Sequence, residues 1–301
     1  MTQIVHMTYT GSCSFGIVDS DGNPVGSKIT YLCSNMSSSL DQKVLFFDHI
    51  VGLRDTISMS ATLTSNVAGS KKGEADAATH NTQKKVYRYS PAIAKASFSG
   101  PIPADNFDKI FDAAIQGDTV ETEMVFWKDN APSVRVGKAK IDNFSIDIKA
   151  GGVVTFSVSL TGAEYELTEN STSQAADCQK LLTWDVCSVD ASPITSDAES
   201  FQMTINNPVI PIYTTKWSSD DASGGMMPQK IRIGMQEVSG SIGVYGADTI
   251  HVTTTGDITV TLNNLLKKIK AAFVQPKDNA SGGPYVRTIM FTGVNDGDVW
   301  Q

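Results

Sequence analysis

The chain has 301 residues, of which 41 % are hydrophobic and 19 % charged, and its formal net charge of −8 comes from 24 basic and 32 acidic side chains. This composition excludes an intrinsically disordered chain, and the acidic balance disfavours a protein that grips nucleic-acid phosphates. The sequence has no apolar stretch of membrane-spanning length and no export-like leader, so we expect neither a membrane span nor secretion.

The first predicted element is a β-hairpin near the start of the sequence. Ser14–Val18 and Lys28–Cys33 have strand-like composition, and residues 19–24 between them are turn formers. The alternate carboxylates of this turn resemble a calcium loop, but the bidentate Glu that would complete one is missing. We therefore expect a hairpin turn and no metal site.

Two long polar loops are predicted next, at about 68–90 and 214–229. Loops longer than about 12–15 residues without structure of their own are uncommon and tend to be functional or disordered. Both loops hold large side chains, which form interfaces when they meet a partner. The candidate interface residues are Lys84, Lys85, Tyr87, Arg88, Tyr89, Trp217, Met226 and Met227.

Alternation of apolar and polar residues dominates the sequence and predicts strands with one buried face. Turn-forming residues separate these strands at the spacing of hairpins. The fold class is therefore mainly β and antiparallel. The predicted strands are 119–127, 133–141, 144–148, 156–161, 250–254 and 258–262, with turns at 129–132, 142–143 and 150–152.

Two segments depart from this alternation and predict helices. In Asp105–Gln116 the apolar residues recur at helical spacing, with Asp105 as the N-cap and Gly117 as the C-terminal glycine. A second helix is predicted from Leu265 to Phe273. Each half of the chain would then carry one helix packed on β-structure.

The two halves share short signatures in the same order, which suggests an internal duplication. Leu63-Thr64-Ser65-Asn66 matches Thr204-Ile205-Asn206-Asn207, Ser97–Gly100 matches Val238–Ser241, and a Gly-Gly/Thr-Gly pair brackets a strand in each half. We predict a first β-domain at 1–168, a linker at 169–179 and a second β-domain at 180–301, with no counterpart of residues 1–45 in the second half.

The sequence carries no recognisable catalytic apparatus. The histidines are far apart, and no nucleotide-binding glycine motif is present. The cysteines form no zinc-ligand pattern; reduced thiols are expected at Cys13, Cys33, Cys178 and Cys187, although a Cys13–Cys33 bridge across the first hairpin stays open. We expect no enzyme activity, no metal and no cofactor.

Together these features resemble the tail tube proteins of long-tailed bacteriophages. The local resemblance lies in Ala94–Pro101, Lys138–Thr161 and Ile231–Tyr245. It implies two tandem β-sandwich or partial-barrel domains, each with a flanking helix. It also implies a structural protein of the virion tail, assembled in the host cytoplasm, whose strands join across subunits into stacked rings.

Several partners follow from this resemblance. The first is the chain itself, in hexameric rings or in trimeric rings of six repeats. The others are further tail proteins such as the tape measure, sheath or terminator, and DNA that passes through the tube without specific binding. Candidate acidic residues of the channel are Glu121, Glu123, Asp142 and Asp147. Alternative functions are a baseplate hub or tail terminator, a secretion-system tube component, or a monomeric ligand-binding β-sandwich.

Overall fold

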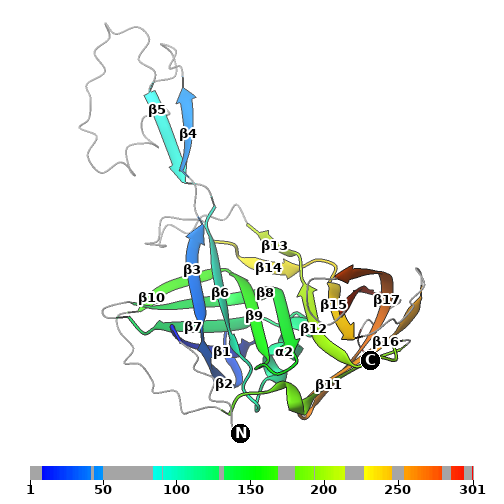
Figure 1. Cartoon of the computed structure of the whole chain (residues 1–301). Coiled ribbons are helices and arrows are strands. Elements are labelled where there is room, and N and C mark those ends of the chain that lie inside the picture. Colours follow the sequence, from blue (N-terminus) through cyan, green and yellow to red (C-terminus); the bar gives the residue numbers. More distant parts are fainter. Residues whose placement is uncertain are drawn as a thin grey trace, which may run out of the picture. The chain divides into compact units, whose positions relative to one another are not determined.

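The protein is mainly β, as the sequence predicts (Figure 1). Among the described residues it contains one α-helix. The computed structural model describes residues 9–41, 44–49, 84–89, 91–128, 132–168, 180–192, 194–213, 227–245, 254–279, 286–294 and 300.

The chain divides into two compact units. The first consists of Met1–Asp41, Ile93–Trp217 and Met227–Gln301, and the second of Gln42–Ala92 and Ser218–Met226. Within the second unit, the described residues form a two-stranded antiparallel sheet of β4 (Val44–His49) and β5 (Lys84–Tyr89). Every other described element belongs to the first unit.

The N-terminal half of the first unit begins with the predicted hairpin. Its turn is closed by the Asp19 carboxylate, which accepts hydrogen bonds from the backbone amides of Asp21 and Asn23. The elements of this half are β1 (Gly11–Val18), β2 (Pro24–Cys33), β3 (Asn35–Asp41), β6 (Ile93–Pro101), α2 (Asp108–Gln116), β7 (Val120–Phe126), β8 (Ser133–Lys149), β9 (Thr155–Gly162) and β10 (Glu164–Thr168).

The C-terminal half of the first unit contains strands and a short 3₁₀ helix in its described residues. Its elements are η1 (Trp184–Val186), β11 (Cys187–Ala191), β12 (Ala198–Asn206), β13 (Val209–Ile212), β14 (Lys230–Ile233), β15 (Glu237–Tyr245), β16 (Thr255–Leu262), β17 (Leu265–Asn279) and β18 (Val286–Gly293).

The same order of strand pairing occurs in both halves. In the first half, neighbouring strands follow the order β1-β7-β8-β9-β6-β3. In the second half they follow β11-β16-β17-β18-β15-β12. A separate hairpin is inserted at the same point of each series, β4–β5 between β3 and β6 and β13–β14 between β12 and β15. Two arrays of six strands with identical connectivity therefore follow one another along the chain.

This repeat begins earlier than the sequence matches indicate. β1 and β3 have counterparts in β11 and β12, so the prediction that residues 1–45 lack a counterpart is wrong for these two strands, while β2 has no counterpart among the described strands of the second half. The sequence match pairs Ser97 with Val238. When Gly162 is aligned with Gly293, the strand pairing instead aligns Ser97 with Ser241, three residues further along the chain. The signature at Leu63–Asn66 lies outside the described residues.

The first predicted helix is present and the second is not. α2 begins at Asp108 with Phe107 as its N-cap, two residues after the expected cap, and ends at Gly117 in the left-handed conformation. Leu265–Phe273 belongs instead to strand β17. Asn263, with a φ of 53°, and Asn264 form the tight turn that returns the chain from β16. The buried residues Ile269, Ala271 and Phe273 then alternate along β17 as in any half-buried strand.

A further correction concerns residues 142–143. They were expected to form a turn between two strands, but β8 runs through them as one strand of 17 residues with a bulge between Ile141 and Asn143. A bulge bends a strand without ending it. β8 can therefore take part in both layers of the fold.

The core of the first half lies between these layers. Tyr31 of β2 packs edge-on against Phe156 of β9, with the ring centroids 5.5 Å apart. Phe111 of α2 packs in the same way against Phe144 of β8, at 5.3 Å. One face of β6, β9 and the C-terminal part of β8 is therefore covered by β1, β2, β7 and α2, and no element that the structure describes covers the opposite face. Of the cysteines, Cys13, Cys33 and Cys187 are free thiols.

Candidate functional site

The two halves of the first unit are joined along β8. The N-terminal part of this strand pairs with β7 and β10, and its C-terminal part pairs with β9. On the other edge of the C-terminal part lies β12, from the second half, in seven residue pairs that run from Ser200 opposite Lys149 to Asn206 opposite Asn143. The joint between the halves is thus an ordinary antiparallel ladder (Figure 1).

The strands equivalent to β12 and β8 each have an edge without a described partner. β3 corresponds to β12, but among the described strands it pairs only with β6. β17 corresponds to β8, and beyond Ala272 its described pairing is with β18 alone. The chain therefore presents one strand edge at each end of an array that runs β3-β6-β9-β8-β12-β15-β18-β17.

The register of the repeat aligns these edges with the internal joint residue by residue. β6 is equivalent to β15, so the residues of β3 that pair with β6 can be aligned with the residues of β12 that pair with β15. This alignment matches Asn35–Asp41 with Ser200–Asn206, the seven residues that pair with β8. In the same way, the partners in β9 and β18 align Ser145 of β8 with Lys277 of β17. The edge of β3 therefore has the length and position of its side of the joint, and the described edge of β17 matches the β8 side up to Asp147.

Burial differs between the open edge and the joint. Phe201, Met203 and Ile205 point from β12 into the core and are buried. Their equivalents in β3, Met36, Ser38 and Leu40, remain partly or fully exposed. An edge strand with exposed apolar residues on its core side is a surface that strand pairing with another chain would cover.

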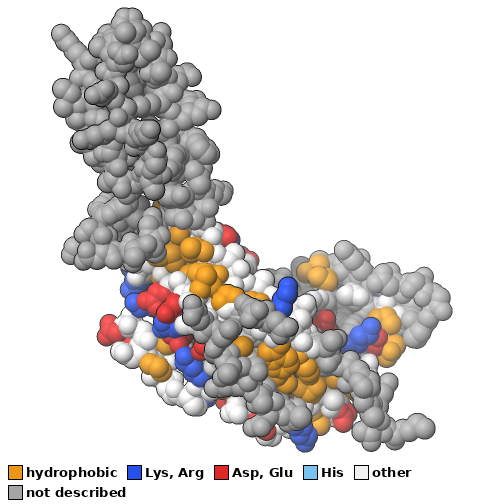
Figure 2. All heavy atoms as spheres, turned by 90° about the vertical axis from the view of Figure 1, so that its left-hand side faces the viewer, with side chains coloured by type: hydrophobic (Ala, Val, Ile, Leu, Met, Phe, Trp, Pro, Cys, Tyr) orange, Lys and Arg blue, Asp and Glu red, His pale blue; other side chains and the backbone are white. Residues whose placement is uncertain are grey.

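The predicted acidic residues fall into different environments. Glu121 of β7 is buried, and its carboxylate binds both Lys28 and Arg135. Burial alone would raise the pKa of Glu121, but the hydrogen bonds and charges of Arg135 and Lys28 hold it below its usual range. Arg135 also pairs with Glu166. Figure 2, which faces the side where β7 and β10 lie in Figure 1, shows basic and acidic side chains next to one another. Glu121 is therefore neutralised by its partners.

Glu123, Asp142 and Asp147 are not brought together with Glu121. Glu123 is partly exposed on β7, and Asp147 is exposed near the end of β8. Asp142 occupies the bulge of β8, where Thr161 donates a hydrogen bond to Oδ2 at 2.5 Å and Oδ1 has no partner among the described residues. Burial raises the pKa of Asp142 to about 6.

The predicted interface residues of the long loops are only partly described. Lys84, Lys85, Tyr87, Arg88 and Tyr89 form strand β5, so this part of the first segment is not a loop. Trp217 and Met226 lie outside the described residues. Met227 is partly buried and packs against the core. Open strand edges were expected, since the resemblance implies strands that join across subunits, but no sequence signal located them, because their position follows from strand order and not from composition.

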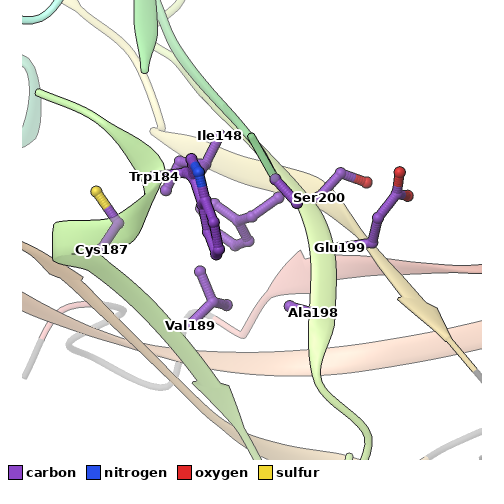
Figure 3. Close-up of a pocket in the computed structure, with 9 residues that line it drawn as sticks. Ile148, Trp184, Cys187, Val189, Ala198, Glu199 and Ser200 are labelled. Carbon is purple, nitrogen blue, oxygen red and sulfur yellow. The ribbon is translucent and has the colours of Figure 1, made fainter. Parts of the chain in front are cut away.

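A small pocket lies between η1, β11 and β12 (Figure 3). Trp184, Val189 and Ala198 line it, together with Ile148 from the end of β8. Figure 3 shows the Glu199 side chain at its edge, directed away from these apolar groups. The arrangement offers no paired acid and base within the pocket.

Among the residues that the structure describes, no three metal-ligating side chains converge. No helix in the same part of the chain is long and apolar enough to span a membrane. A family model described as phage tail tube protein matches residues 56–292. The chain belongs to the phage tail tube protein family. No curated protein matches the chain.

Membership of the tail tube protein family covers most of both strand arrays. It identifies the chain as a structural component of a phage tail. The two open edges thus occur in a member of a family of tube proteins. Open strand edges are able to pair with the edge of another chain.

Proposed function

We propose that the chain polymerises through stacked rings into a hollow tail tube that conducts DNA from the capsid to the host. The observation that carries this proposal is the repeated strand order with one open edge at each end. A contact between two different edges is heterologous, and heterologous contacts close into rings when the rotation between copies permits it.

In the proposed ring, β3 of one copy pairs with the C-terminal part of β17 of the next copy. The internal pairing of β12 with β8 is the template for this contact, since each strand is replaced by its equivalent. The pairing aligns Ser39 with Lys277 and Ser38 with Asp278, by analogy with Thr204 opposite Ser145 and Met203 opposite Ile146.

Three copies give a ring of six similar arrays, the trimeric form that the resemblance implies. Three times the eight strands from β3 to β17 makes a continuous sheet of 24 strands. At about 4.8 Å between strands and a tilt of about 40°, such a barrel is roughly 50 Å across its backbone. Barrels of 16–18 strands already leave an aqueous channel, so this one would be wide enough for DNA.

The proposed tube needs a second contact, between rings. We assign it to the second unit, through the Lys84–Tyr89 strand and Met226, and to the residues Trp217 and Met227 of the first unit that border the segment 218–226. Replacement of Gly73–Thr82 by a short Gly-Ser linker would then leave rings intact but stop their elongation. Full-length tubes from this variant would place the stacking contact elsewhere.

The other proposed partners are the tail proteins that adjoin a tube, such as the tape measure, sheath or terminator, with assembly in the host cytoplasm and no enzyme activity. A hub or terminator would form single rings, and a monomeric binding protein none. A secretion-system tube component would also form stacked rings, but in a host that carries no phage.

Electron microscopy of the purified chain tests the proposal. We expect rings or tubes, and native mass spectrometry of single rings should give three chains per ring. A persistent monomer at tens of micromolar under several salt conditions would refute polymerisation, and six chains per ring would refute the trimer.

A further inference from the structure

The uncovered face of the eight-stranded array has an unusual composition. In one row across seven strands, each residue lies opposite the next, and all are small hydroxyl or amide residues. This row consists of Asn35, Ser99, Ser157, Ser145, Thr204, Ser239 and Thr292.

A second row, two residues along the strands, repeats this composition. It consists of Ser37, Ser97, Ser159, Asn143, Asn206 and Glu237, of which only Glu237 is charged. The Ser37 and Ser97 hydroxyls are hydrogen-bonded across the strands at 2.7 Å. We call these two rows the hydroxyl face.

Charged residues lie on the same face around these two rows, among them Lys149, opposite Ser200, and Lys277, opposite Thr288. Lys95 lies one step from the second row and is paired with Asp41 at 2.7 Å. Asp147 lies beside the first row, opposite Thr155 and Gln202. The hydroxyl face therefore carries no unpaired positive charge within its two rows.

The other polar surface of the first half contrasts with it. On β7, β8 and β10 the outward residues include Glu121, Arg135, Glu164 and Glu166, joined by ion pairs to one another or to Lys28 and Lys138. An exposed strand face normally carries such mixed charges. The two rows of the hydroxyl face contain no lysine or arginine, and this difference from the charged face calls for an explanation.

Only one face of the array can line a channel. The face opposite the hydroxyl face is covered by β1, β2 and α2, as the contacts of Phe156 with Tyr31 and of Phe144 with Phe111 demonstrate. In a closed ring these covering layers leave the channel widest when they lie outside the barrel, because inside it they would occupy about 10 Å on each side. The hydroxyl face then points inward.

We propose that the hydroxyl face lines the channel and is the surface along which DNA slides, an inference that rests on the proposed function. Affinity for the DNA backbone comes mainly from lysine and arginine, which displace counterions from the phosphates. Short neutral hydroxyls make only exchangeable hydrogen bonds like those of water. A neutral surface of this kind would not bind the DNA backbone tightly, and it would not have to be strongly acidic to avoid such binding.

Cysteine labelling of assembled tubes tests which face is inside. Ser157→Cys places a thiol in the middle of the hydroxyl face, and the matched control Glu166→Cys places one on the charged face, both with Cys178 and Cys187 replaced by serine. The tubes are treated with biotin maleimide and then with streptavidin-coated gold particles wider than the channel. We expect gold along the walls of Glu166→Cys tubes and bare walls for Ser157→Cys, although mass spectrometry finds biotin on both.

Gold along the walls of Ser157→Cys tubes, with none on Glu166→Cys tubes, would overturn the inference while leaving the tube intact. Absence of tubes from the unmodified chain would instead refute the proposed function, and the inference with it. A second readout uses Ser157→Lys, which should trap DNA inside tubes and protect it from nuclease. Glu166→Lys should give no protection, and equal protection by both variants would contradict an inward hydroxyl face.

Discussion

Leu40 and Ile205 occupy equivalent positions in the two strand arrays, yet the exposed fraction of Leu40 is 43 % and that of Ile205 is 0 %. Ile205 is covered because β12 pairs with β8. Leu40 lies on β3, which has no second neighbour among the described strands. The difference between these residues marks the edge at which the proposed ring adds another copy of the chain.

A proline at Ser38 should block ring closure without unfolding the chain. At the joint, the backbone amide of Asn207 donates to Asp142 and that of Ala150 to Glu199, so the odd-numbered residues of β12 bond with β8. Their equivalents in β3 include Ser38, whose amide would face the open edge. Proline is tolerated on an edge strand where its missing N–H faces solvent. We expect Ser38→Pro to remain monomeric in sedimentation experiments.

The control for this prediction is Ser38→Thr, which keeps the amide and favours strands. It should assemble like the unmodified chain, and circular dichroism should find the same strand content in both variants. Tubes from Ser38→Pro would show that β3 does not form the contact.

Removal of the Asn207 side chain should weaken the joint between the halves. Its buried amide donates to the Ala114 carbonyl at 2.9 Å and to the Ile141 carbonyl at 3.1 Å. Asn207→Ala removes both hydrogen bonds, and the Ala114 carbonyl keeps only the Gln236 amide at 3.1 Å, so the free energy of unfolding should fall by about 1–3 kcal/mol. Urea unfolding of the dissociated chain measures this change. The exposed neighbour Asn206→Ala should cost under about 0.5 kcal/mol, and equal losses would contradict the role of Asn207.

The carboxyl of Asp142 should make stability depend on pH. Burial raises its pKa to about 6 in the folded chain, against about 3.9 when unfolded. The folded state then binds more protons than the unfolded state between these values, so this group lowers stability as the pH rises from about 4 to about 6. Thr161 and Lys95, the groups near it, oppose the shift only in part.

Asp142→Asn removes this titration. We expect the variant to be more stable than the unmodified chain by about 1–3 kcal/mol at pH 7.5 and nearly equal to it at pH 4. Urea unfolding at both pH values gives the difference. A variant that is less stable at pH 7.5 than the unmodified chain would mean that the charge of Asp142 is favourable where it lies.

The sequence predicts the strand pattern and α2 because the alternation and the C-terminal Gly117 are local signals. It fails at 265–273 because Lys267 occupies an inward position of β17. There its ammonium pairs with Asp112 and lies over the Phe111 ring, 5.6 Å from the centroid. This lysine interrupts the alternation and leaves the apolar residues at apparently helical spacing.

The strands that form the open edges could not be identified in the same way. β3, a run of serines with Met36 and Leu40, gives no sign that its second edge is unpaired, since pairing partners are far apart in the sequence. The order of the short sequence signatures suggested a repeat, but it did not give the residue-by-residue alignment of the two halves. A shift of three residues, as at Ser97, exchanges the two faces of a strand.

Disulfide cross-linking between copies tests the central claim most directly. The proposed pairing sets Ser39 of one copy opposite Lys277 of the next, so Ser39→Cys/Lys277→Cys should form disulfides between chains under mild oxidation. A non-reducing gel should then contain one, two and three linked chains and none larger, because three copies close the ring. Ser39→Cys/Asp278→Cys, in which the pleat reverses the second position, should form few or none. Absence of linked chains from the first variant in assembled tubes, or equal linkage in both variants, would contradict the pairing of β3 with β17.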